Sequence, residues 1–395
     1  MRRSRSRVAA CALVAACGHA DPPLGGDGAP GPGVDAPPSH DGKVPIFIAQ
    51  GTLGRTIISC DDGRTWVANH SWDVDGDALM CGMVQDGVRC GQSTCSYVVG
   101  DQCVPLTCCD DTPDIPEGVA FGPDAIVGAW GHGKPGALRT TTDGAIWTTT
   151  ETSYAYSVAY GSGRFVAAGN RRTEWSTDGR VWMPGGDAAF NTNGSPVRSF
   201  GYGDFGAGGR FVAVSAGGGL RDILVSSDGG LTWKRPSVVP DSCALGVGTN
   251  GGDILGGPDG LLLIVDGHGT ACWSRDGGDT WSVSPTGLTQ IASHGMWTGT
   301  EFRYWGENQM VASSDGMSWH ATPLATPTRI GPTARSDAGT FVAVPYVFDS
   351  YERQHMLRST DDGITWEPLA IEAFPQGHAI YRIGFGYANP SEVCP

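Results

Sequence analysis

Short runs in which apolar and polar residues alternate recur along almost the whole chain after residue 43. Examples are YSVAYG (156–161), GRFVAAG (163–169), GRFVAVS (209–215) and TFVAVPY (340–346), separated by turns rich in Gly, Asp and Ser. Their length and their branched or aromatic content are typical of β-strands. No segment keeps an amphipathic helical period over three turns. The pattern predicts an all-β fold made of many short strands.

A second string recurs between these runs in seven copies that each end in Trp. Four copies fit S-x-D-x-G-x-T-W, and they end at Trp66, Trp233, Trp281 and Trp366. Three copies, which end at Trp147, Trp182 and Trp319, keep only a shifted Asp-Gly and the Trp. The Trp residues are about 35 to 51 residues apart, except for a first gap of about 81. A period of this size predicts a propeller or a solenoid.

The repeated string has the chemistry of a β-turn that joins two strands. In the full copies an Asp carboxylate can accept hydrogen bonds from turn amides, and Gly can take a positive φ. These carboxylates are Asp61, Asp228, Asp276 and Asp361. The Trp enters the next strand and buries a large ring against a neighbouring unit. Sixty-one glycines suit a fold with many tight turns.

The string resembles the Asp-box (BNR) repeat of β-propellers in the sialidase-like and sortilin-like superfamily, which is also found in photosystem assembly propellers. The resemblance covers nearly the whole chain after residue 43. It implies a seven-bladed β-propeller in which each box joins the third and fourth strands of a blade. In that family the boxes lie on the face opposite the active site. The resemblance therefore implies a structural role for the Asp and Trp residues of the boxes.

The two ends of the chain are predicted to meet in blade one. KVPIFIAQG and TIISCDD supply too few strands before Trp66, whereas HAIYRIGFGYA (378–388) matches the segments that open other blades. The C-terminal strand is therefore expected to close blade one. Cys394 follows that strand and Cys60 lies in the first box, so these two cysteines are expected to be bonded. Cys243 and Cys272 are expected to pair within blade five.

The first gap contains a Cys-rich insertion, residues 70–115, within the propeller domain of residues 44–395. Its six cysteines are Cys81, Cys90, Cys95, Cys103, Cys108 and Cys109. Their spacing matches no zinc ribbon, and no His cluster is nearby. Disulfides among these six are predicted in place of a metal site.

The N-terminus reads as an export signal. Residues 1–16 combine four arginines with an apolar run too short to span a bilayer, and Val14-Ala15-Ala16-Cys17 resembles a bacterial lipobox. The alternative is a secretory peptide cut after a small residue. Residues 17–43 are predicted to be a lipidated Cys17 and a disordered tether rich in Pro and Gly. The expected location is the outer membrane or cell surface of a bacterium, reached through the lipid anchor alone.

Charge excludes one class of partner. The net charge of −15 becomes −19 once residues 1–16 are removed, and no basic stripe offsets it. Nucleic acid is therefore not an expected partner. A monomer is expected.

If the boxes mark one face, loops that enter the innermost strands and loops that join second and third strands form the other. The polar residues on these loops are His132, Lys134, Arg171, Arg172, Glu174, Arg221, Asp222, His268, Glu307, Asp349, Tyr351, Glu352, Arg353, His355 and Glu372. The insertion is expected to overhang this face and to form one wall of a binding cleft.

Sialidases hold a substrate carboxylate with three arginines and use Tyr, Glu and Asp for catalysis. The candidates for such a set are Arg329, Arg382, Arg198, Tyr351, Glu352 and Asp349. Both Arg329 and Arg382 are expected to point toward the channel mouth. However, the N-terminal Arg-Ile-Pro motif of the family is missing, and adjacent side chains in an extended loop point apart. Structural, catalytic and anion- or glycan-binding roles for the arginines all stay open.

The sequence holds partial patterns for two further chemistries. Hydrolysis of xyloglucan would need two carboxylates across a cleft, for which Asp349, Glu307, Asp222 and Glu174 are candidates. DVDGDA places Asp73, Asp75 and Asp77 in an alternation that Ca²⁺ favours, but the Gly and Glu of an EF-hand loop are absent, and a solvated acidic turn is the alternative.

The leading hypothesis from the sequence is an exported surface lipoprotein whose propeller binds a glycan or an extracellular protein. A complete scaffold without a complete catalytic set favours it. A divergent sialidase-like glycoside hydrolase is the alternative, and an assembly scaffold is the third possibility. No cofactor is expected apart from the candidate Ca²⁺.

Overall fold

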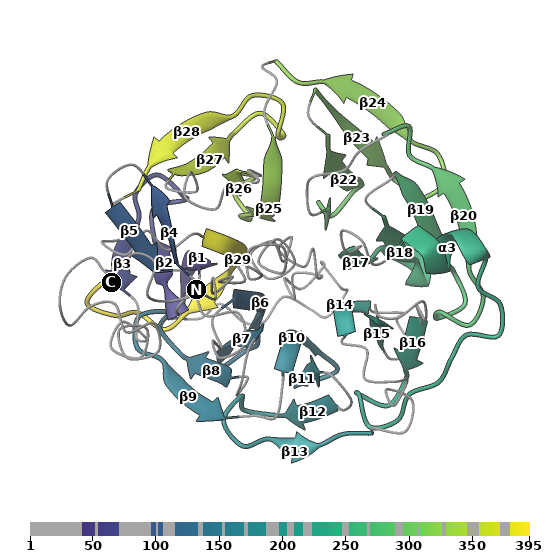
Figure 1. Ribbon diagram of the computed structural model, residues 1–395, viewed down its shortest axis with the longest axis horizontal. Helices are drawn as coiled ribbons and strands as arrows, with labels where there is room; N and C mark the ends of the chain where they lie inside the picture. The colour runs from purple at the N-terminus through teal and green to yellow at the C-terminus, as the bar shows by residue number, and fades with distance from the viewer. Residues whose placement is uncertain are drawn as a thin grey trace, which may run out of the picture.

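Seven β-sheets are arranged radially around a central axis, so the protein is a seven-bladed β-propeller (Figure 1). Each sheet is one blade; six blades have four strands and blade four has three. The computed structural model describes residues 42–51, 54–70, 96–99, 102–105, 115–132, 137–151, 155–169, 173–186, 197–203, 209–215, 223–246, 253–266, 269–288, 295–306, 308–325, 329–345, 355–371 and 380–395.

The strands of blades one to four, from the innermost outward, are as follows. Blade one has β29 (Ile380–Ala388), β1 (Val44–Gly51), β2 (Thr56–Ser59) and β3 (Val67–His70). Blade two has β6 (Ile115–Phe121), β7 (Ile126–His132), β8 (Ala137–Thr141) and β9 (Thr148–Glu151). Blade three has β10 (Ala155–Gly161), β11 (Arg164–Gly169), β12 (Thr173–Ser176) and β13 (Met183–Pro184). Blade four has β14 (Val197–Gly203), β15 (Arg210–Ser215) and β16 (Ile223–Ser226).

The remaining elements complete the ring. Blade five has β17 (Asp253–Gly256), β18 (Leu262–Val265), β19 (Thr270–Ser274) and β20 (Ser282–Pro285). Blade six has β21 (Met296–Trp297), β22 (Phe302–Trp305), β23 (Gln309–Ser313) and β24 (His320–Pro323). Blade seven has β25 (Ile330–Arg335), β26 (Phe341–Pro345), β27 (His355–Ser359) and β28 (Glu367–Ala370). The described residues also include two short helices, α3 (Asp241–Gly246) and η2 (Pro258–Gly260).

Blade one joins the two ends of the chain, as the sequence predicted. β29 is its innermost strand and pairs antiparallel with β1, from Val44 opposite Ala388 to Gly51 opposite Ile380. Because β29 comes from the C-terminus and the other three strands come from the N-terminus, the ring closes without an unpaired edge at this point. Figure 1 shows the yellow C-terminal strand beside the purple N-terminal one.

Between the end residues of the predicted insertion, the structure describes only the antiparallel pair β4 (Ser96–Val99) and β5 (Gln102–Pro105). Cys103 lies on β5, and its side chain is outside the described residues. Cys81, Cys90, Cys95, Cys108 and Cys109 also lie outside the described residues, so the predicted pairing among these six cysteines stays a prediction.

The hydrophobic core is divided into seven clusters, one between each pair of neighbouring blades. Between blades seven and one, for example, Val342 packs with Phe47 and Ile383. Each sheet therefore buries both of its faces, which explains why many strands read as nearly continuous apolar runs. The described residues thus form separate interblade clusters in place of one central core.

Blade four lacks a regular fourth strand, which the repeat spacing did not predict. Val225 exchanges both backbone hydrogen bonds with Lys234 at 2.9 Å, but the next position on that segment whose N–H would face β16 is Pro236, which has no N–H to donate. The chain instead crosses to blade five, where Trp281 N donates to Val238 O at 2.9 Å. α3 then packs on β19 and β20, so this segment links blades four and five.

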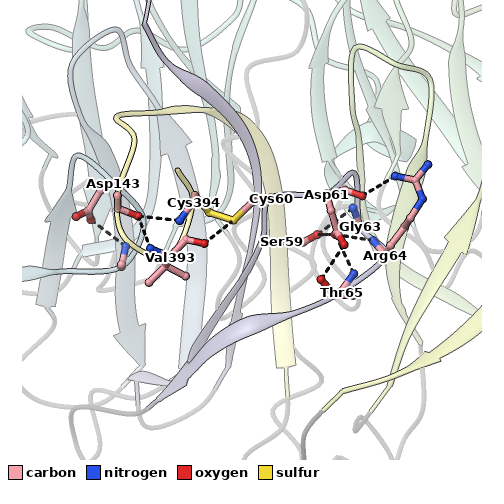
Figure 2. Close-up of a disulfide and its surroundings, with 11 residues drawn as sticks. Ser59, Cys60, Asp61, Gly63, Arg64, Thr65, Asp143, Val393 and Cys394 are labelled. Carbon is pink, nitrogen blue, oxygen red and sulfur yellow. Dashed lines mark hydrogen bonds between the residues drawn. A yellow bond between two sulfur atoms is a disulfide. The ribbon is translucent and has the colours of Figure 1, made fainter.

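Two disulfides match the predicted pairings. Cys60 bonds to Cys394 and Cys243 bonds to Cys272, each with Cα atoms 5.6 Å apart. Figure 2 shows the first bond beside the hydrogen bonds of Asp61. Asn389 N, just after β29, donates to Thr142 O in blade two at 2.7 Å. The C-terminal tail is therefore fixed to both blade one and blade two.

Removing the Cys60–Cys394 bond is expected to lower the free energy of unfolding more than removing the Cys243–Cys272 bond. The first bond spans 334 residues of sequence and the second spans 29. In the chain-entropy model this difference in loop length is worth about 2 kcal/mol. Urea denaturation of the two double variants, Cys60→Ser/Cys394→Ser and Cys243→Ser/Cys272→Ser, measures both losses. Equal losses would show that loop entropy does not govern the closure.

Candidate functional site

All seven predicted Asp turns, called repeat turns below, connect the third strand of a blade to its outer segment, and together they define the repeat-turn face. In every turn a hydroxyl two residues before the Asp donates to its carboxylate at 2.7 to 3.0 Å. The same hydroxyl accepts the amide of the turn glycine at 2.8 to 3.0 Å. The hydroxyls are Ser59, Thr141, Ser176, Ser226, Ser274, Ser313 and Ser359. The turns of Asp143, Asp178 and Asp315 thus share the hydroxyl hydrogen bonds of the full copies, although their sequences do not match the full repeat.

The repeat turns come in two lengths. In the full copies, such as Asp61, Oδ1 accepts the amides three and four residues on, and Oδ2 accepts the Thr65 hydroxyl at 2.7 Å. In the short copies, such as Asp143, Oδ1 accepts the amides two and three residues on, at 2.9 and 3.0 Å. The additional residue in the full copies takes a positive φ, 62° at Asp62 and at Asp362 and 74° at Gly229.

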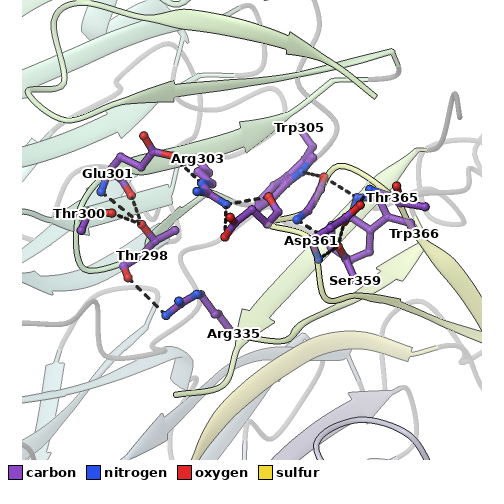
Figure 3. Close-up of polar contacts among 12 residues, drawn as sticks. Thr298, Thr300, Glu301, Arg303, Trp305, Arg335, Ser359, Asp361, Thr365 and Trp366 are labelled. Atoms are coloured by element: carbon purple, nitrogen blue, oxygen red, sulfur yellow. Dashed lines mark hydrogen bonds and ion pairs between the residues drawn. The ribbon is translucent and has the colours of Figure 1, made fainter. Parts of the chain in front are cut away.

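Each repeat turn lies against the preceding blade. A Cβ on Gly179 would come within 2.7 Å of Val127 Cγ2 in blade two, and a Cβ on Gly363 within 2.7 Å of the Trp305 ring in blade six. Trp305 Nε1 donates to Gly363 O at 2.9 Å, as Figure 3 shows. Arg303 donates to Asp362 O at 2.7 Å. These glycines are required for close contact as well as for their positive φ.

The carboxylates of the repeat turns are held in the ionised form. Burial would raise the pKa of six of them, but the hydrogen bonds from turn amides and hydroxyls outweigh burial and lower the pKa. For Asp178 the amides of Val181 and Arg180 are the largest causes of the lowered pKa. A carboxylate that stays ionised and is saturated with donors is a poor general acid or base, which agrees with a structural role.

Adding a methyl group to a repeat-turn glycine is expected to separate neighbouring blades. Gly179→Ala would place Cβ against Val127, whereas Gly163→Ala, also at positive φ, would place Cβ in open space. Both variants carry the backbone strain of about 1 kcal/mol, and only Gly179→Ala adds an overpacking cost of roughly 1 to 3 kcal/mol. Denaturant unfolding measures the difference. Equal stability of the two variants would contradict a packing role for the turn glycines.

Acid is expected to destabilise the propeller through the repeat turns. A carboxyl whose pKa is lowered in the folded state contributes stability above its unfolded pKa, near the reference value of 3.8, and loses it as the pH falls through the folded pKa. The free energy of unfolding should therefore fall with increasing slope below about pH 4. Asp228→Asn should reduce the number of protons taken up on unfolding by up to about one. Parallel slopes for Asp228→Asn and the wild type would argue against this linkage.

The face opposite the repeat turns holds the arginine candidates, in two different environments. Arg329, directly before β25, is exposed, whereas Arg382 on β29 is 0% exposed. Arg382 faces blade two, because Gly384 and Gly386, on the same side of β29, contact Val119 and Phe121 there. The expectation that both arginines point toward the channel mouth therefore does not hold for Arg382. Arg198 lies on β14, and its side chain is outside the described residues.

Only part of the remaining candidate set can be placed. Glu174 on β12 and His355 on β27 are both partly exposed. His132 ends β7, and its side chain is outside the described residues. The candidates that lie wholly outside the described residues are Lys134, Arg171, Arg172, Arg221, Asp222, His268, Glu307, Asp349, Tyr351, Glu352, Arg353 and Glu372, together with Cys17, Asp73, Asp75 and Asp77.

Sequence reasoning missed a group of buried polar residues beside Arg382. Gln50 pairs with Arg382 across β1 and β29, and it pairs with Thr56 across β1 and β2. Gln50 and Thr56 are both 0% exposed. The signal in the sequence is a single polar residue near the end of the apolar strand VPIFIAQG, which alternation alone does not distinguish from a surface position.

Within the described residues, no group of three or more His, Cys, Asp or Glu side chains is placed to hold a metal ion. The described helices include none with the length and apolar character needed to cross a bilayer.

No protein-family model matches this sequence, and neither does any curated protein. Similar solved structures include YCF48 bound to D1 peptide, at 15% identity and a TM-score of 0.47, over 80% of this chain and 96% of that chain. YCF48 from Cyanidioschyzon merolae matches at 14% identity and a TM-score of 0.44, over 62% and 81%. Apo AztD from Citrobacter koseri matches at 7% identity and a TM-score of 0.43, over 87% and 98%. At these values the similarities carry no argument about function, and the propeller is defined by its own sheet topology.

Proposed function

We propose that this chain is a binding module that engages a glycan or an extracellular protein through the face opposite the repeat turns. The proposal is based on the different environments of Arg329 and Arg382. Arg382 is packed between blades and Arg329 is exposed, so they do not combine into one solvent-open clamp for a carboxylate. Binding without turnover therefore accounts for this face better than sialidase chemistry does.

The distribution of connections between strands supports the same face. On the repeat-turn side, hairpins such as Gly122–Ala125 and Ser336–Thr340 are closed by backbone hydrogen bonds of 2.8 Å. On the opposite side, the connections between β13 and β14, between β26 and β27 and between β28 and β29 span longer stretches of sequence. Longer loops on a rigid scaffold are where binding residues usually lie.

We further propose that the protein is exported and anchored by lipid at Cys17 to the outer membrane or cell surface of a bacterium, as a monomer. The two disulfides support an oxidising compartment. β1 begins at the repeat-turn face, since β2 runs into the first repeat turn and is antiparallel to β1. A tether over residues 17–43 would join that face and leave the opposite face directed away from the membrane.

The second candidate function is a divergent sialidase-like glycoside hydrolase, and one experiment separates the two. The full chain, secreted with its disulfides formed, is incubated with a fluorogenic aryl sialoside, and its binding is measured on an array of sialylated and neutral glycans. We expect no release of the fluorophore. Turnover by the wild type that is lost in Arg329→Ala would replace the binding proposal with the hydrolase.

For binding to acidic glycans, Arg329→Ala is expected to weaken affinity roughly tenfold, since a charge-assisted hydrogen bond is worth about 1.5 kcal/mol or more. Arg180→Ala, at an exposed arginine of the repeat-turn face, is the matched control and should bind as the wild type does. If the array shows no binding, the glycan form of the proposal is excluded and an extracellular protein partner is left. Equal losses in the two variants would contradict the assignment of the face.

A further inference from the structure

The repeat-turn face carries exposed apolar side chains on one half of the ring. The turns of blades two, three and four expose Ile146 by 76%, Val181 by 66% and Leu231 by 39%. In blade one, Val393 beside the disulfide is exposed by 38%. These four residues are called the apolar arc below. Among the described residues, the turns of blades five to seven expose no large apolar side chain to this extent.

The turns of blades five to seven carry a hydroxyl where the apolar arc has an aliphatic side chain. The residue directly before the repeat Trp in these blades is Thr280, Ser318 or Thr365. In the short copy of blade six, the hydroxyl of Ser318 bonds to the carboxylate of Asp315. Ile146 and Val181 take the same position in the other two short copies and cannot donate. Two turns therefore give up a hydrogen bond and expose a branched apolar side chain.

Contacts between neighbouring blades join these residues into one strip. Cys394, which follows Val393, packs in one cluster with Ala145 in the turn of blade two. The hydroxyl of Thr140 in blade two donates to Gly179 O in the turn of blade three. The turn of blade four lies against blade three in the same way. The apolar arc therefore crosses four neighbouring blades.

The described part of the chain begins beside this strip. Lys43, directly before β1, forms an ion pair at 3.7 Å with Asp124 in the connection between β6 and β7. Val44 packs in the same cluster as Cys394. The N-terminal segment therefore joins the propeller on the repeat-turn face, between blades one and two and next to the apolar arc.

The predicted tether would keep the apolar arc close to a membrane. With the flexible composition predicted for it, the tether over residues 17–43 would have a mean span of roughly 30 Å between a lipid on Cys17 and β1. A tether of this kind gives an effective concentration on the order of millimolar. A few aliphatic side chains can then hold a contact that would be too weak for a free protein.

The charges beside the apolar arc indicate which lipids it fits. In the turns and the C-terminal tail of blades one to four, the exposed charged residues are Arg64, Arg180, Lys234 and Arg235, and Asp124, Asp178, Asp228 and Glu392. The partly exposed ones on this face are Lys43, Arg164 and Arg210, and Asp61, Asp62 and Asp143. Both signs are equally represented, and no polybasic cluster is present among these residues to attract anionic lipid. The surface therefore fits zwitterionic headgroups.

We propose that the apolar arc rests on the surface of a lipid bilayer rich in zwitterionic lipid. Its aliphatic side chains enter the boundary between headgroups and acyl chains, which interfacial segments reach to a depth of about 5 to 10 Å. This inference rests on the proposed lipid anchor at Cys17. The contact holds the repeat-turn face on the membrane and keeps the opposite face turned toward its partner.

The test measures which half of the ring touches lipid. The full, lipidated chain with its disulfides formed is labelled with an environment-sensitive fluorophore at Ile146→Cys or, as the matched control in blade six, at Ser318→Cys. It is reconstituted into vesicles of phosphatidylcholine and phosphatidylethanolamine that contain a lipid with a quencher near the headgroup. We expect at least about twofold stronger quenching at position 146 than at position 318, because only the first enters the interface. Equal quenching at the two positions would overturn the proposal.

A second variant separates the apolar side chains from the tether. The label is placed at Thr177→Cys, an exposed position in the turn of blade three, with and without the triple change Ile146→Ser/Val181→Ser/Leu231→Ser. The triple change should reduce quenching at position 177 to the level of position 318. Undiminished quenching would show that the tether alone sets the orientation and would refute the role of the apolar arc.

Flotation of the vesicles distinguishes failure of the anchor from failure of the contact. The wild type should float with the vesicles and Cys17→Ser should not. A wild type that does not float would refute the anchor and this inference together, whereas a floating chain with equal quenching would refute the contact alone. A fluorescence change at position 146 that needs high protein density instead of lipid would assign the apolar arc to a second copy of the chain and overturn the lipid contact.

Discussion

The contact between the glycine of each repeat turn and the preceding blade is the interaction on which the rest of this structure depends. The turn has to approach so closely that a Cβ would lie 2.5 Å from Val342 at Gly63 and 2.7 Å from Val166 at Gly230. The Asp and the preceding hydroxyl bond the turn amides and so hold that glycine in place. Repeated around the ring, this local turn sets the spacing of the blades, and the seven interblade clusters form in the spaces that result.

Blade one is where this scheme needs additional support, because its strands come from both ends of the chain. Asp62 accepts hydrogen bonds from Ser336 at 2.6 Å and from Thr340, and it forms an ion pair with Arg358 at 3.2 Å. Tyr387 donates to Asp337 across the same seam, and burial together with this carboxylate raises the pKa of the phenol to about 12.

Six of the repeat Trp residues donate to their turn glycine. Among the described residues Trp66 Nε1 has no acceptor, so blade one relies on the seam and on the disulfide.

The two faces of the ring differ in what their residues do. On the repeat-turn face, the carboxylates, the turn glycines and several arginines are occupied in holding blades together, as Arg303 and Arg358 illustrate. On the opposite side, the connections between β13 and β14, between β26 and β27 and between β28 and β29 span longer stretches of sequence. The proposed partner surface lies on that face. It includes exposed residues such as Arg329.

The sequence by itself determined the propeller, its seven blades, the closing strand near residues 378–388 and the pairs Cys60–Cys394 and Cys243–Cys272. It could do so because repeat spacing, strand alternation and turn chemistry are local properties that can be read within a few residues. Tertiary structure alone decided that Arg382 is buried while Arg329 is exposed, that blade four loses its outer strand after Lys234, and that Gln50 lies against Gly128 of blade two. Side-chain burial depends on which residues a neighbouring blade presents, and those neighbours lie tens or hundreds of residues away in the chain. A period of alternation assigns a residue to one side of its strand, but only the packed ring determines whether that side meets water, an apolar surface or another charge.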